Sequence, residues 1–393
     1  MSRNTIEILS KISKKNERRI IGCLSGTSMD GLDIGVCRIS GYGFNTRIAL
    51  DHFSTIAFPV ELKDTITEQA FNVMQDMHIV SRLNTALGRW IGESILYQLS
   101  EWKCDLGDID AIASHGQTMF HAPNHTEPDR SGTFQIGDAD QIAQITGKIV
   151  VSDFRQKHIS HGGEGAPLAP YLDWVMASSE FMHRVLINIG GIANLTFIPP
   201  QPKFNELVFG DTGPGNTLID RFCALYFNQP YDASGLIARS GKLHHVLFEK
   251  LKSHDYFVKP LPKTTGQEIF SMSWLDACLI EVDVQKSIEP QDVLATLTHL
   301  TAWSIAGAVK PLIQHQNAEL YVSGGGAKND FMLELLEYYL GKAVSTTAEL
   351  GMPPDAKESM LFALLANETL CGDGFPSPNG KGTITFGKIS LPD

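Results

Sequence analysis

A glycine-rich segment that carries a single aspartate limits what this chain can fold into more than any other feature. Residues 210–216 hold three glycines, a proline and Asp211. Apolar residues follow at Leu218, Ile219 and Phe222, with the spacing of one helix face. We predict a tight turn that leads into a helix N-terminus, where free N–H groups and the helix dipole favour an anion. Asp211 is then either a cap in an ordinary turn or a base beside a phosphate.

Two predicted hairpins have glycine-rich tips. Residues 19–25 predict an apolar strand, residues 26–31 a turn, and residues 32–37 a half-buried strand in which apolar and polar side chains alternate. Residues 184–198 repeat this layout around Gly190 and Gly191. Such a tip is either a plain β-turn or a loop that wraps a phosphate. The chain has neither GxGxxG nor GxxxxGK[ST], so a Rossmann or Walker-type site is not expected.

The rest of the chain alternates apolar strands with amphipathic helices. Polar residues follow the predicted strand 110–113 directly, and in α/β sheets ligands bind where strands end. A third glycine loop, residues 324–326, joins the predicted strand 319–322 to the predicted helix 331–340, with Asn329 or Asp330 as its N-cap and Gly341 at its end. The order of hairpins, strands and helices predicts two related α/β halves.

Asp355 and Glu358 are spaced as a helix-capping pair. In one interpretation Asp355 is the N-cap and Glu358 reaches back to it, and the spacing favours this one. In the other, the two carboxylates lie beside a metal-bound phosphate.

Composition excludes several functions. The net charge of −12 argues against a nucleic-acid partner, whose phosphates would be repelled. No apolar run approaches the roughly 20 residues that span a bilayer, and six scattered cysteines without a CxxC pair favour free thiols in the cytoplasm. His158, His161 and Glu164 have one-turn spacing, but the glycines around them disfavour a helix, so no metal site is expected there.

An ordered series of motifs resembles the anhydro-N-acetylmuramic acid kinases. The motifs are residues 25–31, 115–118, 135–138, 153–155, 162–168, 188–195, 211–216 and 324–326. The resemblance implies a two-domain actin-like ATPase (ribonuclease H-like) α/β fold that closes on a nucleotide in an interdomain cleft. It implies a cytoplasmic enzyme of murein recycling that uses ATP, Mg²⁺ and water to open the 1,6-anhydro ring and phosphorylate the sugar at O6.

The resemblance also implies lobes and partners. We expect an N-terminal lobe over residues 18–178, onto which residues 371–393 pack back, and a C-terminal lobe over residues 179–370. The expected partners are ATP and an anhydro-amino sugar, with no nucleic acid and no membrane. A homodimer is left open.

The resemblance assigns roles to individual residues. Asp211 matches the catalytic base and Glu358 a second active-site carboxylate, and both face Mg²⁺ through its phosphate. Nucleotide-binding residues are expected at Gly26, Thr27, Ser28, Met29, Asp30, Gly31, Leu32, Asp33, Gly190, Gly191, Asn194, Gly213, Gly324, Gly325 and Gly326. Sugar-binding residues are expected at His115, Gln117, Thr118, Asp153, Arg155 and Gly163, with Arg155 suited to an anionic lactyl group.

Two positions depart from the family pattern, and so does the loop around Lys357, which differs from the common small residues. His158 stands where the family usually has Asp, and Glu164 where it usually has Gln. They keep open a kinase for another sugar, such as levoglucosan or a free sugar. A non-catalytic, actin-like ATP-binding switch is the alternative of another class, although it would need a partner-binding domain and no appended one is visible.

Overall fold

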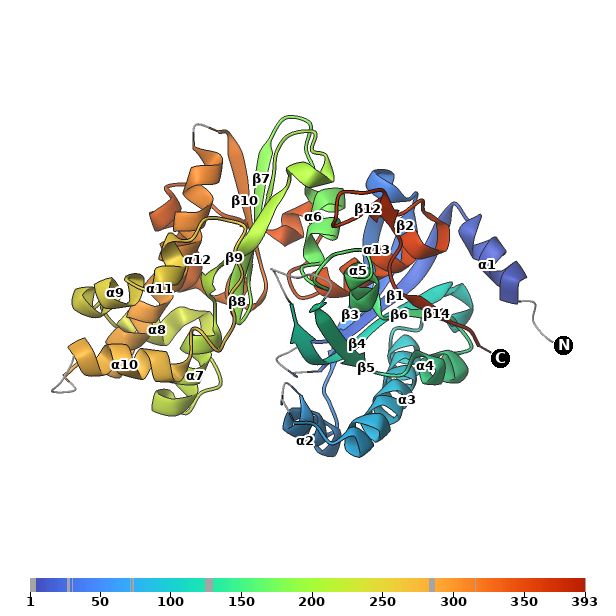
Figure 1. Cartoon of the computed structure of the whole chain (residues 1–393), viewed down its shortest axis with the longest axis horizontal. Coiled ribbons are helices and arrows are strands. Elements are labelled where there is room, and N and C mark those ends of the chain that lie inside the picture. The colour runs from blue at the N-terminus through green and yellow to red at the C-terminus, as the bar shows by residue number, and fades with distance from the viewer. Residues whose placement is uncertain are drawn as a thin grey trace. The chain divides into compact units, whose positions relative to one another are not determined.

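The computed structural model describes residues 5–26, 29, 31–70, 72, 74–123, 130–282, 287–314 and 316–392 (Figure 1). The chain divides into two compact units. Met1–Met176 and Ala356–Asp393 form the first unit, and Ala177–Asp355 forms the second. Residues 356–370, which the sequence analysis assigns to the second lobe, thus group with the first unit.

The first unit is built on a seven-stranded sheet with the order β14-β6-β4-β1-β2-β3, in which β5 also pairs with β4. Its strands are β1 (Glu17–Ser25), β2 (Leu32–Ser40), β3 (Arg47–Ile56), β4 (Ala111–Ala122), β5 (Gly132–Ile136), β6 (Ile149–Ser152) and β14 (Lys388–Ser390), with a separate pair β12 (Phe375–Pro376) and β13 (Thr383–Ile384). Its helices are α1 (Thr5–Ser13), α2 (Val60–Gln69), α3 (Met77–Glu101), α4 (Ala139–Thr146), α5 (Phe154–Ile159), α6 (Ala169–Ala177) and α13 (Lys357–Cys371).

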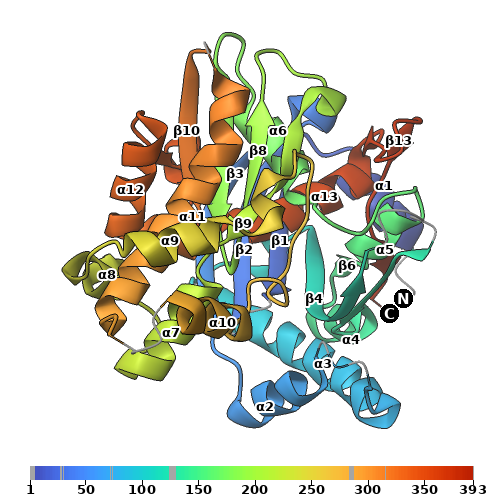
Figure 2. The same cartoon turned by 60° about the vertical axis from the view of Figure 1, so that its left-hand side comes forward.

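The second unit is built on a five-stranded sheet with the order β11-β10-β7-β8-β9. Its strands are β7 (His183–Ile189), β8 (Ile192–Ile198), β9 (Val208–Pro214), β10 (Ala318–Ser323) and β11 (Ser345–Thr346). Its helices are α7 (Thr217–Phe227), α8 (Leu236–Ser240), α9 (His245–Lys252), α10 (Met272–Val282), α11 (Pro290–Ile313) and α12 (Asp330–Leu340). Helix α11 contacts β7, β8 and β9, and α12 packs beside it (Figure 2).

The two sheets share one topology. In each, an antiparallel meander of three strands is extended by two strands that run parallel to its first strand: β6-β4-β1-β2-β3 in the first unit and β11-β10-β7-β8-β9 in the second. The prediction of two related α/β halves is therefore confirmed. A repeated five-stranded mixed sheet of this order is the ribonuclease H-like motif of an actin-like fold.

Two opposed layers of apolar side chains explain why the first sheet folds. On one face, alternate residues such as Ile21 and Cys23 of β1 join Leu83, Leu87 and Ile91 of α3 in one buried core. This is the pattern expected where a strand of period two meets a helix of period 3.6. Helix α13 contacts β1, β2 and β4. Helices α3 and α13 therefore both pack on this sheet.

Paired glycines let α13 approach the sheet closely. Gly22 and Gly35 lie opposite each other in the β1–β2 ladder. A Cβ at Gly22 would lie 1.9 Å from the carbonyl oxygen of Ser359, and one at Gly35 would lie 2.5 Å from the Ser359 hydroxyl. The first turn of α13, which carries Glu358, is held in place by this contact.

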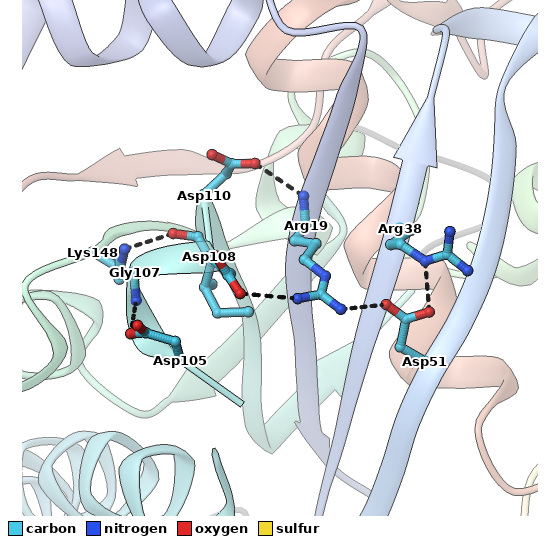
Figure 3. A network of polar contacts seen from close by, with 9 residues as sticks. Arg19, Arg38, Asp51, Asp105, Gly107, Asp108, Asp110 and Lys148 are labelled. Atoms are coloured by element: carbon cyan, nitrogen blue, oxygen red, sulfur yellow. Dashed lines mark hydrogen bonds and ion pairs between the residues drawn. The ribbon is translucent and has the colours of Figure 1, made fainter. Parts of the chain in front are cut away.

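A network of charged side chains lies at the end of the first sheet where the parallel strands β1 and β4 begin (Figure 3). Asp51 accepts from Arg38 at 2.7 Å and from Arg19 at 3.0 Å. Burial acts to raise the pKa of Asp51, but the hydrogen bonds and charges of both arginines outweigh it, and the pKa lies below its ordinary value. The main-chain N–H of Arg19 also donates to Asp110, which pins β1 to β4. The network therefore stabilises the sheet.

Three local predictions need correction. Strand β4 runs to Ala122, so the polar residues from Ser114 onward lie within the strand and not in a loop after it. Asp211 lies on strand β9, and the turn comes only after Pro214. Asp355 does not cap α13, because the helix begins at Lys357 and the Asp355 carboxylate pairs with Lys328 at 2.8 Å.

Two expectations about the ends of α12 hold. The side chain of Asn329 accepts from the N–H of Met332, and Gly341 ends α12 in the left-handed conformation. Over the described part of the chain, no helix is long and apolar enough to cross a membrane.

Candidate functional site

Asp211 is fixed by three hydrogen bonds within the second unit. Its main-chain N–H donates to the carbonyl of Lys263 at 2.8 Å, and its carbonyl accepts from the Tyr256 hydroxyl at 2.8 Å. A further bond binds the carboxylate itself, because the N–H of Thr265 donates to Oδ2 at 2.8 Å. In the ladder between β9 and β8, Asn194 lies opposite Asp211. No described residue donates to Oδ1, which is free to accept a proton.

The surroundings of Asp211 suit a base. Burial raises the pKa of its carboxyl to about 6, and the N–H of Thr265 opposes that shift by stabilising the ionised form. A carboxylate with such a pKa is ionised at neutral pH and is a stronger base than an exposed aspartate. Beside it, the Thr265 hydroxyl is buried and has no hydrogen-bond partner among the described residues.

Three glycine loops of the second unit converge. Where β7 turns into β8, the carbonyls of Gly190 and Gly191 accept from the N–H groups of residues 215–217 at the start of α7. Gly324, which follows β10, lies so close that a Cβ there would be 2.7 Å from the carbonyl oxygen of Ile189. Gly326 lies equally close, with its Cβ position 2.5 Å from that of Ile189, whereas Gly325 is exposed. The structure thus brings the predicted nucleotide-binding residues Gly190, Gly191, Gly324 and Gly326 close together.

Gly213 serves packing. It lies buried on β9, where a Cβ would meet the ring of Phe257 at 2.9 Å and the hydroxyl of Ser304 at 3.0 Å. Its neighbour Thr212 is also buried, and its hydroxyl donates to the carbonyl of Ala193 at 3.1 Å. Both residues hold β9 in place beside Asp211.

In the first unit, Arg155 is the centre of the predicted sugar site. Its Nε–H donates to Nε2 of His115 at 2.7 Å, and its Nη1 donates to the carbonyl of Gly165 at 3.0 Å. Burial lowers the pKa of the guanidinium, and the negative charge of Glu358 opposes the shift. No ion pair joins Arg155 to an acidic side chain in the described ranges. The guanidinium is therefore not held in an ion pair, and Glu358 is the acidic group whose charge acts on it.

Gln117 and Thr118 are buried on β4. Gln117 accepts from the hydroxyl of Ser25 at the end of β1 and donates to the carbonyl of Thr118 at 3.2 Å. The hydroxyl of Thr118 lies 3.5 Å from the amide nitrogen of Gln135 on β5. These side chains link β4 to its neighbours β1 and β5.

Asp153 and Gly163 have structural partners. Asp153 precedes α5 in the left-handed conformation and pairs with Lys388 of β14 at 2.9 Å. Gly163 is buried directly under an imidazole ring, and a Cβ there would lie 2.4 Å from Cε1 of His158. The structure therefore places Gly163 beneath His158.

The two departures from the family pattern differ in environment. His158 is buried, and its Nδ1 accepts from the N–H of Gly165 at 3.0 Å. Its ring stacks on Phe386 and meets Tyr171 edge-on. Glu164, in the same loop, is partly exposed. Position 158 thus contributes an acceptor to the loop.

Glu358 lies in the first turn of α13 and is exposed. Its neighbour Lys357 is buried and pairs with the buried Asp173 of α6 at 2.7 Å. Asp211 and Glu358 belong to different units. Among the described residues, no group of three histidine, cysteine or acidic side chains could hold a metal ion.

The first hairpin tip is described in part. Thr27, Ser28 and Asp30 lie outside the described residues. Gly26 is partly exposed, and Met29, Gly31 and Leu32 are buried. Asp33, the remaining residue predicted there, accepts from the hydroxyl of Thr55 on β3 at 2.6 Å.

The residues that hold Asp211 escaped the sequence analysis. Tyr256, Lys263 and Thr265 lie far along the chain, and two of their three contacts use main-chain groups of Lys263 and Thr265. A main-chain contact leaves no trace in residue type. Only the polar turn around residues 260–265 could have drawn attention to this segment.

Comparisons with known proteins show the family to which the chain belongs. The family model described as "Anhydro-N-acetylmuramic acid kinase" matches residues 18–391. A protein of that name from Pseudoalteromonas atlantica (strain T6c / ATCC BAA-1087) is 41% identical over 99% of this chain and 99% of its own length. One from Francisella tularensis subsp. novicida (strain U112) is 35% identical over 94% of this chain and 98% of its own. The chain therefore belongs to the anhydro-N-acetylmuramic acid kinase family.

Proposed function

We propose that this protein is an ATP-dependent sugar kinase that opens the 1,6-anhydro ring of anhydro-N-acetylmuramic acid and phosphorylates O6. The product is N-acetylmuramic acid 6-phosphate, and the reaction belongs to cytoplasmic murein recycling. The name of the relatives supports the substrate. The observation that carries the chemistry is the Asp211 carboxylate, with Oδ2 fixed by Thr265 and Oδ1 free.

Asp211 acts as the general base. Its carboxylate takes a proton from a water molecule that attacks the anomeric carbon, and the bond from that carbon to O6 breaks. The electron pair stays on O6, which attacks the γ-phosphate of ATP, and ADP leaves. The buried Thr265 hydroxyl, which has no partner among the described residues, is available to the attacking water or to a sugar hydroxyl.

The nucleotide binds along the glycine loops. Gly26, Gly31, Gly190, Gly191 and residues 324–326 carry no Cβ that would keep a phosphate or a ribose away from main-chain N–H groups. Carboxylate oxygens are the protein ligands that Mg²⁺ prefers, so Asp211 and Glu358 fit a phosphate-bound ion. Bound Mg²⁺ would supply charge neutralisation at the phosphates.

Arg155 binds the lactyl carboxylate of the sugar. The guanidinium is partly buried and forms no ion pair with an acidic side chain of the described ranges, although the charge of Glu358 acts on it. Such a group is suited to a carboxylate, and charge-assisted hydrogen bonds of this kind are strong. Levoglucosan has no such carboxylate. This feature therefore favours the anhydro-muramic substrate over the alternative.

Asp211→Asn tests the base directly. The amide keeps the shape and the hydrogen bond from Thr265 but cannot take a proton, so we expect turnover to fall by about 10²–10⁴ while the Kd for ATP stays within about twofold. Turnover is measured with anhydro-N-acetylmuramic acid, levoglucosan and N-acetylmuramic acid. Near-full turnover by the variant with bound ATP would refute the assignment of Asp211.

A melting curve is the folding control for this variant. Because burial raises the pKa of Asp211 from 3.8 to about 6, the ionised carboxylate destabilises the folded state above about pH 6. Asn removes that charge, so Asp211→Asn should melt no lower than the wild type at pH 7. A variant that unfolds earlier cannot be used to judge the base.

A further inference from the structure

Two histidines surround the Arg155 guanidinium without neutralising it. His115 lies on β4 and receives the Nε–H of Arg155 at its Nε2, at 2.7 Å. His158 lies on α5, one turn after Arg155, and acts through Gly165: its Nδ1 receives the N–H of Gly165 at 3.0 Å, and the Gly165 carbonyl receives Nη1 of Arg155 at 3.0 Å. Both ends of the guanidinium are thus tied to an imidazole.

The hydrogen bonds define the tautomer of each ring. His115 has the carbonyl of Gly116 at 3.0 Å from Nδ1. A carbonyl can only accept, so Nδ1 carries the proton and Nε2 offers a lone pair to Arg155. His158 accepts at Nδ1, so its proton is on Nε2. Each ring therefore accepts a hydrogen bond at an unprotonated nitrogen, as a neutral imidazole does.

Burial supports the neutral state of both rings. It lowers the pKa of His115 to about 3 and that of His158 to about 4, and the positive charge of Arg155 acts in the same direction. Both rings are also held by packing: His115 lies 4.6 Å from the ring of Phe362, and His158 lies against Gly163 and Phe386.

A neutral acceptor and a carboxylate have different effects on an arginine. Either can orient the guanidinium, but a carboxylate also cancels its charge and lowers its attraction for a second anion. In the described residues, the acceptors on Arg155 are one imidazole and one carbonyl, both neutral. Its Nη2 group is left for a ligand, and Glu358 is the acidic side chain whose charge acts on Arg155.

We infer that His115 and His158 are positioning residues that aim Arg155 at the carboxylate of the sugar without themselves neutralising its charge. This inference rests on the proposed function, because it assumes an anionic sugar. His115 acts directly on the guanidinium. His158 acts through the loop that presents the Gly165 carbonyl.

The test measures the discrimination between an acid and its ester. Binding of anhydro-N-acetylmuramic acid and of its lactyl methyl ester is measured by calorimetry with the full-length Asp211→Asn protein in the absence of ATP, so that the sugar is not phosphorylated during the measurement. The Kd of the ester divided by the Kd of the acid is the ratio that reports the charge contact. If the histidines had only a structural role, replacing them would weaken the binding of both ligands equally and leave the ratio unchanged.

His115→Leu and His115→Gln form the matched pair. Leu removes the acceptor, and the ratio should fall about tenfold, the loss expected for a misaligned charge-assisted bond. Gln places an amide oxygen near the position of Nε2 and should restore most of the ratio. For the second ring, His158→Leu and His158→Asn are the corresponding pair, because the Asn oxygen replaces Nδ1. Equal loss for acid and ester in the Leu variants would overturn the inference.

His115→Glu tests the charge argument and does not depend on whether the Leu variants fold. A carboxylate at this position keeps a hydrogen bond to Arg155 but cancels its charge, so the acid should bind no better than the ester. If His115→Glu kept the wild-type ratio, neutrality of the acceptor would be irrelevant and the inference wrong.

Two controls separate this inference from the proposed function. In the Arg155→Ala background, adding His115→Leu should change the ratio no further, because the contact is already absent. If the wild type binds the acid tightly but does not phosphorylate it, the proposed reaction fails while the histidine ratios still decide the inference.

Discussion

At the scale of single residues, the chain uses burial to set acid–base properties. Asp211 is held by Thr265 and Tyr256, and its pKa is raised to about 6. The two histidines near Arg155 have pKa values of about 3 and about 4, so they do not titrate between pH 5 and 8. Burial thus makes the Asp211 carboxylate more basic and keeps the two imidazoles neutral.

The pH profile of kcat/KM follows from the pKa of Asp211. A base must be ionised, so kcat/KM should be constant above about pH 6 and fall about tenfold per pH unit below it. The profile is measured from pH 5 to 8 with saturating ATP. The residual activity of Asp211→Asn should lack this step, whereas Glu358→Gln, which leaves Asp211 in place, should keep it. A step of the same size in Asp211→Asn would assign the titration to another group.

At the scale of elements, α13 positions the second predicted carboxylate. The helix approaches the β1–β2 ladder over Gly22 and Gly35, and its first turn carries Glu358. Lys357 anchors the same turn to Asp173 of α6 in a buried ion pair. The strand glycines and the ion pair thus act together on one turn of helix.

Gly22→Ala should therefore displace the first turn of α13. The added Cβ would meet the Ser359 carbonyl at 1.9 Å, a clash with main chain that costs at least about 1–3 kcal/mol of stability. We expect a lower melting temperature and a loss of turnover, measured by calorimetry and a coupled kinase assay. Gly132→Ala is the matched control, because Gly132 lies on β5 with nothing within 4 Å of its Cβ position. Equal melting of the two variants would contradict the close approach of α13.

At the scale of the whole molecule, the two units are joined by the chain twice. The chain leaves the first unit after Met176 and returns to it at Ala356. The helices next to these crossings, α6 and α13, are linked by the Asp173–Lys357 ion pair inside the first unit. Two neighbouring connections anchored in one unit suit a hinge. A kinase also has to keep bulk water away from ATP, because bulk water would hydrolyse it.

We expect the units to close when substrates bind. The radius of gyration from small-angle X-ray scattering should decrease when a non-hydrolysable ATP analogue and the sugar are added together. Sugar alone is the control and should have a smaller effect. An unchanged radius with both ligands would count against a hinge.

The sequence alone determined the repeated architecture and the residue types of the site. Alternating strands around glycine tips predicted two related α/β halves, and the ordered motifs predicted the family. Local rules were sufficient wherever a neighbour along the chain decides the structure, as at the Asn329 cap and the Gly341 helix end.

Only the tertiary structure decided what these residues contact. Asp355 follows the spacing of a cap but pairs with Lys328, and Asp211 lies on a strand where its carboxylate meets the N–H of Thr265, 54 positions away. His158 departs from the family pattern, yet in the fold it supplies an acceptor to the loop beside Arg155. The physical reason is that burial and long-range hydrogen bonds, which set the pKa of Asp211 and the aim of Arg155, depend on segments that sequence spacing does not relate.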